Sequence, residues 1–250
     1  MTRQAGRALE WQFEEMVSAT GWIDDKRLLI ASETQLFSFD VESGRRDFVA
    51  SLEADNPATR SNDGRADPWG GFWISTMGKK GECGAGAIYR LYCGEMRQLF
   101  RNITIPNSIC FAPNRSVVYF TDTPTRKVMA QPLDAEGWPQ GAPRVFLDLT
   151  RAGSFPDGAV TDIKGNIWVA HWGSALVAAY APDGTLLNEV QVGAVQTTCP
   201  AFGGPDFGTL FITTAQEGLK PEALANDSLA GQVFSVKSDA RGLPEFKVRI

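Results

Sequence analysis

The sequence has few of the residues on which several common kinds of site depend. Its 250 residues contain one histidine, His171, so a site with two histidine ligands is excluded and any His-based triad would need this residue. The four cysteines, at positions 83, 93, 110 and 199, are irregularly spaced and form no CxxC pair. This spacing argues against structural zinc and against a disulfide framework, so we expect free thiols in a reducing cytoplasm.

Long apolar runs and basic clusters are also absent. No apolar stretch approaches the roughly 18 residues of a membrane-spanning helix, and the opening "MTRQAGRALEWQF" has no apolar signal-peptide core. The net charge is −5 without any basic run, which argues against nucleic acid as a partner because phosphate binding needs clustered Lys and Arg. Apolar residues make up 43% of the chain, enough for the core of a single domain over residues 1–250.

An internal repeat is the strongest pattern that is present. Five segments share a small or polar opening, a short strand-like run, a polar turn and an aliphatic or aromatic strand: "VSATGWIDDKRLLIAS" from Val17, "SNDGRADPWGGFWIST" from Ser61, "PNSICFAPNRSVVYFTD" from Pro106, "PDGAVTDIKGNIWVAH" from Pro156 and "TTCPAFGGPDFGTLFIT" from Thr197. The equivalent second positions, at steps of 44, 45, 50 and 41 residues, hold Ser18, Asn62, Asn107, Asp157 and Thr198. A more polar pair of strand-like runs follows each segment.

This repeat predicts the fold class. Two strands joined by a tight turn form a hairpin, and four antiparallel strands about every 40 to 50 residues form one blade of a β-propeller. We predict an all-β, six-bladed propeller of four-stranded blades whose first blade is incomplete, because "RALEWQFEE" resembles an outer strand without its inner partners. An opening, or a displaced strand from the chain ends, is therefore expected between the blades that start near Val17 and near Gln196.

Three of the second-position residues carry oxygen ligands. The innermost strands of a propeller start near one mouth of its channel, so Asn62, Asn107 and Asp157 are expected to converge there. Amide and carboxylate oxygens are hard donors that suit Ca²⁺, Mg²⁺ or Mn²⁺. Asn and Asp also favour turns, but three of them in equivalent register favour a site.

Three segments, "RSNDGRADPWGGFWISTMG", "IPNSICFAP" and "PDGAVTDIKGNIWVA", resemble the signature segments of the senescence marker protein, regucalcin and gluconolactonase family. The match runs from about Val17 to about Thr214. It implies a six-bladed propeller with one divalent cation in its channel and hydrolysis of sugar lactones, and it leaves Ca²⁺, Mg²⁺, Mn²⁺ and Zn²⁺ open as the cation.

The resemblance also assigns roles to single residues. It implies that Asn107 and Asp157 ligate the cation and that Asp157 moves the proton. Arg60 and Asn62, in "RSNDG", would contact the substrate, with Asn62 close to the cation. Glu82, ahead of "GAIYR" in a Gly-rich segment, matches an acidic substrate contact of the animal members.

One part of the family pattern is missing. A Gly-Glu-Gly-Pro-like segment, whose glutamate ligates the cation in the family, has no counterpart before "EWQFEEMVSATGW". Glu14 and Glu15 lie too close to the next inner strand to replace it by alignment, and Glu33 lies past the far end of a hairpin. Relative to the family pattern the domain is truncated at its N-terminus, so we expect either a misassigned start codon or a site with one anionic ligand and weak cation binding.

Lactone opening suits this set of residues. A hard dication polarises a carbonyl, a carboxylate can take and return a proton, and the guanidinium of Arg60 can hold substrate oxygens. Two alternatives stay open: a related propeller hydrolase that acts on another ester or a phosphotriester, and a propeller that binds calcium or another ligand without catalysis.

The remaining polar and aromatic residues of the repeat are interpreted as structural. His171 is expected to be a packed residue rather than a base. Aspartates near hairpin turns can bond neighbouring backbone N–H groups, and the strand tryptophans are core residues by default; these are Asp67, Asp122, Asp162, Trp69, Trp73 and Trp168.

Overall fold

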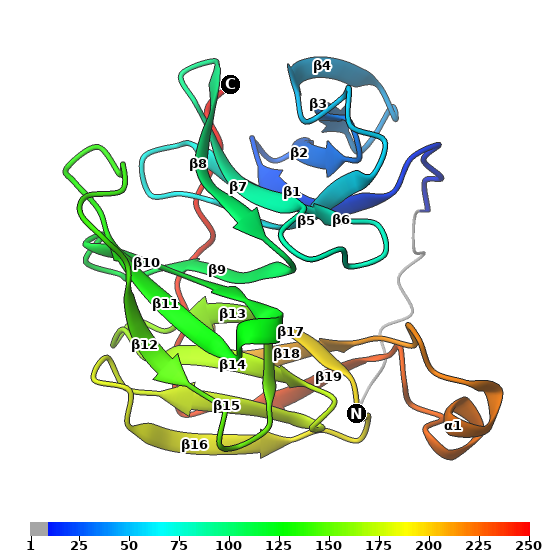
Figure 1. Ribbon diagram of the computed structural model, residues 1–250, viewed down its shortest axis with the longest axis vertical. Helices are drawn as coiled ribbons and strands as arrows, with labels where there is room; N and C mark the ends of the chain where they lie inside the picture. Colours follow the sequence, from blue (N-terminus) through cyan, green and yellow to red (C-terminus); the bar gives the residue numbers. More distant parts are fainter. Residues whose placement is uncertain (1–9) are drawn as a thin grey trace.

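The computed structural model describes residues 10–250, whose strands form five antiparallel sheets, the blades of an all-β propeller (Figure 1). Blade 1 contains β1 (Val17–Trp22), β2 (Arg27–Ser32), β3 (Gln35–Asp40) and β4 (Arg46–Ser51). Blade 2 contains β5 (Thr59–Ala66), β6 (Phe72–Gly78), β7 (Gly86–Tyr92) and β8 (Glu95–Ile103). Blade 3 contains β9 (Pro106–Phe111), β10 (Val117–Asp122), β11 (Lys127–Pro132) and β12 (Arg144–Asp148), with the short helix η1 (Thr123–Thr125) between β10 and β11.

The last two blades follow the same plan. Blade 4 contains β13 (Phe155–Thr161), β14 (Ile167–Trp172), β15 (Leu176–Tyr180) and β16 (Leu186–Gln191). Blade 5 has three strands, β17 (Thr197–Gly203), β18 (Thr209–Thr214) and β19 (Val233–Lys237), with the helix α1 (Pro221–Asn226) before β19. No helix within residues 10–250 is long and apolar enough to cross a bilayer.

The predicted number of blades is wrong. The described residues form five blades instead of six, and the incomplete sheet is the last one, not the first. Residues 10–16 form no strand, and residues 7–9, the first three of "RALEWQFEE", lie outside the described part of the chain. Trp11 and Phe13 instead pack edge-on against Phe39 of blade 1, at ring-centroid distances of 5.4 Å. This segment therefore covers an apolar face of blade 1 instead of pairing as a strand.

The hydrophobic core lies between neighbouring blades. Successive side chains of a strand point to opposite faces, so Ala159 packs towards blade 3 and Val160 packs towards blade 5. Trp73 of blade 2 and Ile109 of blade 3 are buried in one cluster, and Leu29 and Phe72 join blades 1 and 2. Burial of both faces explains why the second strands of blades 1 to 4 are almost continuously apolar, whereas the residues of β18 in blade 5 alternate between buried and more exposed.

The ring of blades is open on one side. The innermost strands lie side by side in the order β1, β5, β9, β13 and β17, whereas β17 and β1 do not pack against each other in this way. The C-terminal residues 239–250, red in Figure 1, cross from blades 4 and 5 to blades 1 and 2. The Ile163 amide donates to Arg241 O at 2.9 Å, and the Val248 amide donates to Trp22 O at 2.6 Å. The predicted opening between blade 5 and blade 1 is therefore present, and the C-terminal segment bridges it.

Candidate functional site

A cavity of about 440 Å³ lies where the innermost strands of blades 2 to 5 begin. This volume is within the range of about 300 to 1,000 Å³ that is typical of small-molecule sites. The wall combines amide, carboxylate, hydroxyl and guanidinium groups with a few apolar side chains: Arg60, Asn62, Met77, Ile105, Asn107, Thr123, Asp157, Trp172, Gln196, Glu217 and Gly218.

A β-bulge sits at the same place in the innermost strands. In β5 the pairing register shifts between Ser61 and Gly64, and in β13 it shifts between Pro156 and Ala159. Asn62 and Asp157 therefore lie inside bulges, which re-aim side chains away from the regular alternation. The bulge of β9 follows directly after Asn107. These bulges, rather than strand alternation alone, direct the predicted residues towards the cavity.

Glycine is required directly after Asp157. A Cβ atom at Gly158 would lie 2.7 Å from Cys199 Sγ and 2.8 Å from Thr198 O. Such distances are too short for any larger residue, so Gly158 allows β17 of blade 5 to approach β13 closely. The close approach brings the start of blade 5 to the wall of the same cavity.

A chain of hydrogen bonds connects the polar residues of blades 2 and 3. Arg60 donates to Asn62 Oδ1 at 3.0 Å, and Asn62 Nδ2 donates to Asn107 Oδ1 at 3.1 Å. Asn107 Nδ2 in turn donates to Thr123 Oγ1 at 3.0 Å. The hydroxyl of Thr123 donates to Pro156 O at 2.8 Å, next to Asp157. The two asparagines are thus held in contact, with their orientations set by neighbours on both sides.

Asp157 is the acidic group on the blade 4 side of the cavity. Burial raises the pKa of its carboxyl well above the ordinary range, and the negative charges of Asp63 and Glu217 add to this rise, while the N–H of Gly158 opposes it. Positive charge close to Asp157 would therefore be strongly favoured by the surrounding electrostatics.

The donor set fits a hard divalent cation. Asp157 offers carboxylate oxygens, and Asn62 and Asn107 offer amide oxygens from two other blades. Within residues 10–250 no group of three or more His, Cys, Asp and Glu side chains is placed to hold a metal ion. A cation in this cavity would therefore rely on amide oxygens as well as on carboxylates.

Glu82 is the one predicted site residue that lies apart from the others. It does not line the cavity, and its side chain is exposed in the turn between β6 and β7. Its Oε2 accepts the backbone N–H of Lys80 at 3.0 Å. The N–H of Glu82 itself, and then the N–H of Lys80, lower the pKa of its carboxyl. In this structure Glu82 stabilises a turn.

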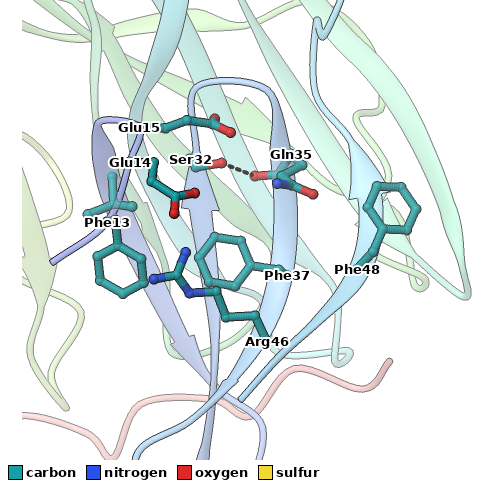
Figure 2. Close-up of a pocket in the computed structure, with 9 residues that line it drawn as sticks. Phe13, Glu14, Glu15, Ser32, Gln35, Phe37, Arg46 and Phe48 are labelled. Carbon is teal, nitrogen blue, oxygen red and sulfur yellow. Dashed lines mark hydrogen bonds between the residues drawn. The ribbon is translucent and has the colours of Figure 1, made fainter. Parts of the chain in front are cut away.

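The three glutamates compared with the glutamate of the family's Gly-Glu-Gly-Pro-like segment also lie elsewhere. Figure 2 shows Glu14 beside Phe13 and Arg46 and Glu15 near Ser32, in a groove of about 190 Å³ on blade 1 that shares no residue with the cavity. Glu15 accepts the N–H of Thr34 at 3.1 Å. Glu33 pairs with Lys79 at 3.3 Å. All three glutamates lie outside the cavity, and Glu15 and Glu33 make local contacts there.

Sequence reasoning missed several residues of the wall, notably Thr123, Trp172, Gln196 and Glu217. Gln196 immediately precedes the repeat segment that starts at Thr197, so its place was visible in the alignment of repeats. Glu217 follows the end of β18, and no local pattern indicates that the chain turns back towards the cavity there.

The aspartates interpreted as structural have the predicted contacts. Asp162 Oδ1 accepts the N–H groups of Lys164 at 2.9 Å and Asn166 at 3.0 Å. Asp122 accepts the N–H of Ile105 at 2.9 Å. These contacts order the hairpin turn of blade 4 and the entry to β9. All four cysteines are free, also as predicted.

His171 is a packed residue outside the cavity wall, as expected. It is 3% exposed, its ring stacks on Tyr180 with a centroid distance of 6.2 Å, and its Nε2 lies 3.2 Å from the hydroxyl oxygen of Tyr180. Burial lowers its pKa from 6.5 to about 4. The fold therefore favours the neutral imidazole.

This lowered pKa makes stability depend on pH in a defined window. Because the folded-state pKa is below the unfolded value, the contribution of His171 to stability is complete above about pH 6.5 and is lost as the pH falls towards about 4, by up to about 3 kcal/mol. NMR titration of the imidazole signals should give a pKa near 4, since the chain has a single histidine. As the pH falls across this window, the free energy of unfolding of His171→Gln should decrease less than that of the parent. A ring that titrates near pH 6.5 in the folded protein would contradict the prediction.

Known proteins resemble this chain along most of its length. A candidate sugar lactone lactonase of Rhizobium meliloti (strain 1021) is 40% identical over 240 residues, which cover 96% of this chain and 81% of the relative. An L-arabinolactonase of Azospirillum brasilense is 34% identical over 238 residues, which cover 93% of this chain and 78% of the relative. The crystal structure of a calcium-binding protein, regucalcin, from Agrobacterium tumefaciens superimposes with a TM-score of 0.92 and 42% identity, over 95% of this chain and 81% of that one.

A protein-family model also matches most of this chain. The model of the SMP-30/Gluconolactonase/LRE-like region matches residues 1–216, which include the repeat segments of Asn62, Asn107 and Asp157. The chain therefore belongs to the SMP-30/gluconolactonase/LRE-like family.

Proposed function

We propose that this chain hydrolyses sugar lactones with the help of a divalent cation held by Asn107 and Asp157. The observation that carries the proposal is the meeting of Asn62, Asn107 and Asp157, from three separate blades, in one cavity with Arg60. Relatives named as lactonases, at 34% and 40% identity, support the substrate class. The solved relative described as calcium-binding supports the cation.

The groups at the cavity have separate roles in the proposed reaction. A divalent cation bound there would supply Lewis acidity towards the lactone carbonyl and towards water. Asp157 takes a proton from the water that adds to the carbonyl carbon, and it returns that proton to the ring oxygen when the bond between the carbonyl carbon and this oxygen breaks. The product is the open hydroxy acid, so water is the only co-reactant.

The other residues bind and orient the substrate. Arg60 already donates to Ser61 O and to Asn62 Oδ1, which fixes its guanidinium at the wall and leaves further N–H donors for lactone oxygens. Asn62 lies between Arg60 and Asn107 and can contact both substrate and cation. Trp172 adds an aromatic surface suited to the C–H groups of a sugar ring. The free cysteines support the cytoplasm as the compartment of this reaction.

The proposal predicts chelator-sensitive lactone turnover. We expect the protein to open glucono-1,5-lactone faster than the spontaneous reaction, to lose this activity after chelator treatment and dialysis, and to regain it with at least one of Ca²⁺, Mg²⁺, Mn²⁺ and Zn²⁺. Acid release at constant pH measures the rate.

Two further substrates separate this function from its alternatives. An aryl ester and an organophosphate should be poor substrates of the same preparation. Turnover of either without turnover of any sugar lactone would identify a different propeller hydrolase. Cation binding without any turnover would identify a binding protein and would refute the proposed catalysis.

A further inference from the structure

The cavity contains a second acidic side chain besides Asp157. Among the described residues of its wall, Asp157 and Glu217 are the only carboxylates, and Arg60 is the only cationic side chain. Glu217 follows β18 in blade 5, whereas Asp157 belongs to β13 in blade 4. Two neighbouring blades therefore each bring one negative charge to the same space.

The backbone around Glu217 is anchored at the cavity. The amide of Ala215 donates to Gln196 O at 3.0 Å, and Gln196 Nε2 donates to Glu217 O at 3.1 Å. Gln216 Nε2 donates to Ala230 O at 2.9 Å. These bonds tie the segment after β18 to the start of β17, so the position of Glu217 at the wall follows from specific contacts.

Gln196 gives an independent indication of a ligand at this place. The residue is 9% exposed and lines the cavity, and its Nε2 donates to the Glu217 carbonyl. Its Oε1 is buried without a hydrogen-bond partner among the described residues. Buried polar atoms are nearly always satisfied, so an unpartnered acceptor of a residue that shares the cavity wall with two carboxylates points to a ligand that carries positive charge or hydrogen-bond donors.

Blade 5 is well placed to contribute a second negative charge. It borders the open side of the ring, and blade 1 on the other side of the opening contributes no described residue to the cavity wall. The equivalent position of blade 1, Ser18, donates its hydroxyl to Ser61 Oγ at 2.7 Å and carries no charge. Without Glu217, the cavity wall itself would offer a dication one formal negative charge, that of Asp157. Asp63, whose charge also raises the pKa of Asp157, is not part of the wall and accepts the N–H of Ile109 at 2.7 Å.

We propose that Glu217 supplies the second negative charge to the cation site of this chain. This inference rests on the proposed function, because it concerns the cation held by Asn107 and Asp157. Glu217 acts from the blade beside the opening, and Gln196 positions it through the bond to its carbonyl oxygen. The role of Glu217 is to raise the affinity for the cation, while proton transfer stays with Asp157.

Calorimetric titration with CaCl₂ and MnCl₂ tests the assignment directly. Glu217→Gln removes the charge while preserving the shape of the side chain. Glu217 is exposed to solvent at the cavity wall, so the lost interaction with a dication is that of a partly screened charge. We expect this variant to bind both cations about 10- to 100-fold more weakly than the parent, which corresponds to about 1.4 to 2.8 kcal/mol. Glu217→Asp should retain part of the affinity because it keeps the carboxylate.

Glu222→Gln is the matched control. Glu222 is exposed in α1, lies outside the cavity wall, and its replacement changes the net charge by the same amount. It should bind cations like the parent, and all variants freed of cation should melt at the parental temperature.

The outcomes keep this inference separate from the proposed function. Equal affinity of Glu217→Gln and the parent, with chelator-sensitive lactone turnover intact in both, would overturn the role of Glu217 and leave the lactonase standing. Weaker binding by Glu222→Gln to the same extent would show a general charge effect and would also overturn it. A parent protein that binds none of the cations and opens no lactone would refute both proposals.

Discussion

Asp157→Asn should lower lactone turnover by at least about a hundredfold while the fold stays intact. The amide keeps one oxygen for a cation but loses both the charge and the basic site, and positioned acid–base catalysis contributes on the order of 10²- to 10⁴-fold. Turnover of glucono-1,5-lactone at saturating cation is the measurement. Parental turnover by a normally folded variant would make Asp157 a turn residue and would remove the base from the mechanism.

Thermal melting in chelator provides a second readout for the same variant. Burial raises the pKa of Asp157 well above the ordinary value. Ionisation of a carboxyl with a raised folded-state pKa costs stability as the pH rises above the unfolded pKa of about 3.9, and the cost is complete above the folded pKa. At pH 8 and without cation, Asp157→Asn should therefore melt at or above the parental temperature. A clearly lower melting temperature would show that the variant disturbs the fold, so that lost activity could not be assigned to chemistry.

Asp67→Ala should cause the largest loss of stability. Asp67 and Arg90 are both 0% exposed, and the Arg90 guanidinium donates through Nε to Asp67 Oδ2 at 2.7 Å. The guanidinium also lies over the rings of Tyr92 at 4.2 Å and Trp138 at 4.4 Å. Removal of one partner leaves a buried, uncompensated charge, so we expect the free energy of unfolding to fall by about 3 to 5 kcal/mol.

Denaturant unfolding of three variants tests this explanation. The double variant Asp67→Ala/Arg90→Met should recover part of the lost stability, because it removes the charge that the single variant leaves unpaired. Asp24→Asn, which breaks the exposed pair with Arg27, should have little effect. An Asp67→Ala protein as stable as the parent would mean that the aromatic rings alone can hold the buried guanidinium.

Much of this protein could be predicted from its sequence because the signals are local. Each repeat contains its own alternating strand, turn residues and apolar strand. A strand buried on both faces needs consecutive apolar residues, such as Trp73 and Ile74 in "GGFWIST". Equivalent register also placed Asn62, Asn107 and Asp157 together, since identical positions of a repeated unit meet near one axis. The roles of Asp162 and Asp122 followed from the short reach of their side chains.

Only the tertiary structure decided the remaining features, because they depend on how distant parts of the chain pack. The number of blades depends on which faces find partners, and the segment with Trp11 and Phe13 covers blade 1 instead of pairing as a strand. Glu82 turns back onto its own loop, although the family resemblance implied a substrate contact. Glu217 reaches the cavity through bonds to Gln196, 21 residues earlier in the chain. Residue type and spacing determine which side chains have the right chemistry, whereas long-range packing determines which of them share one space.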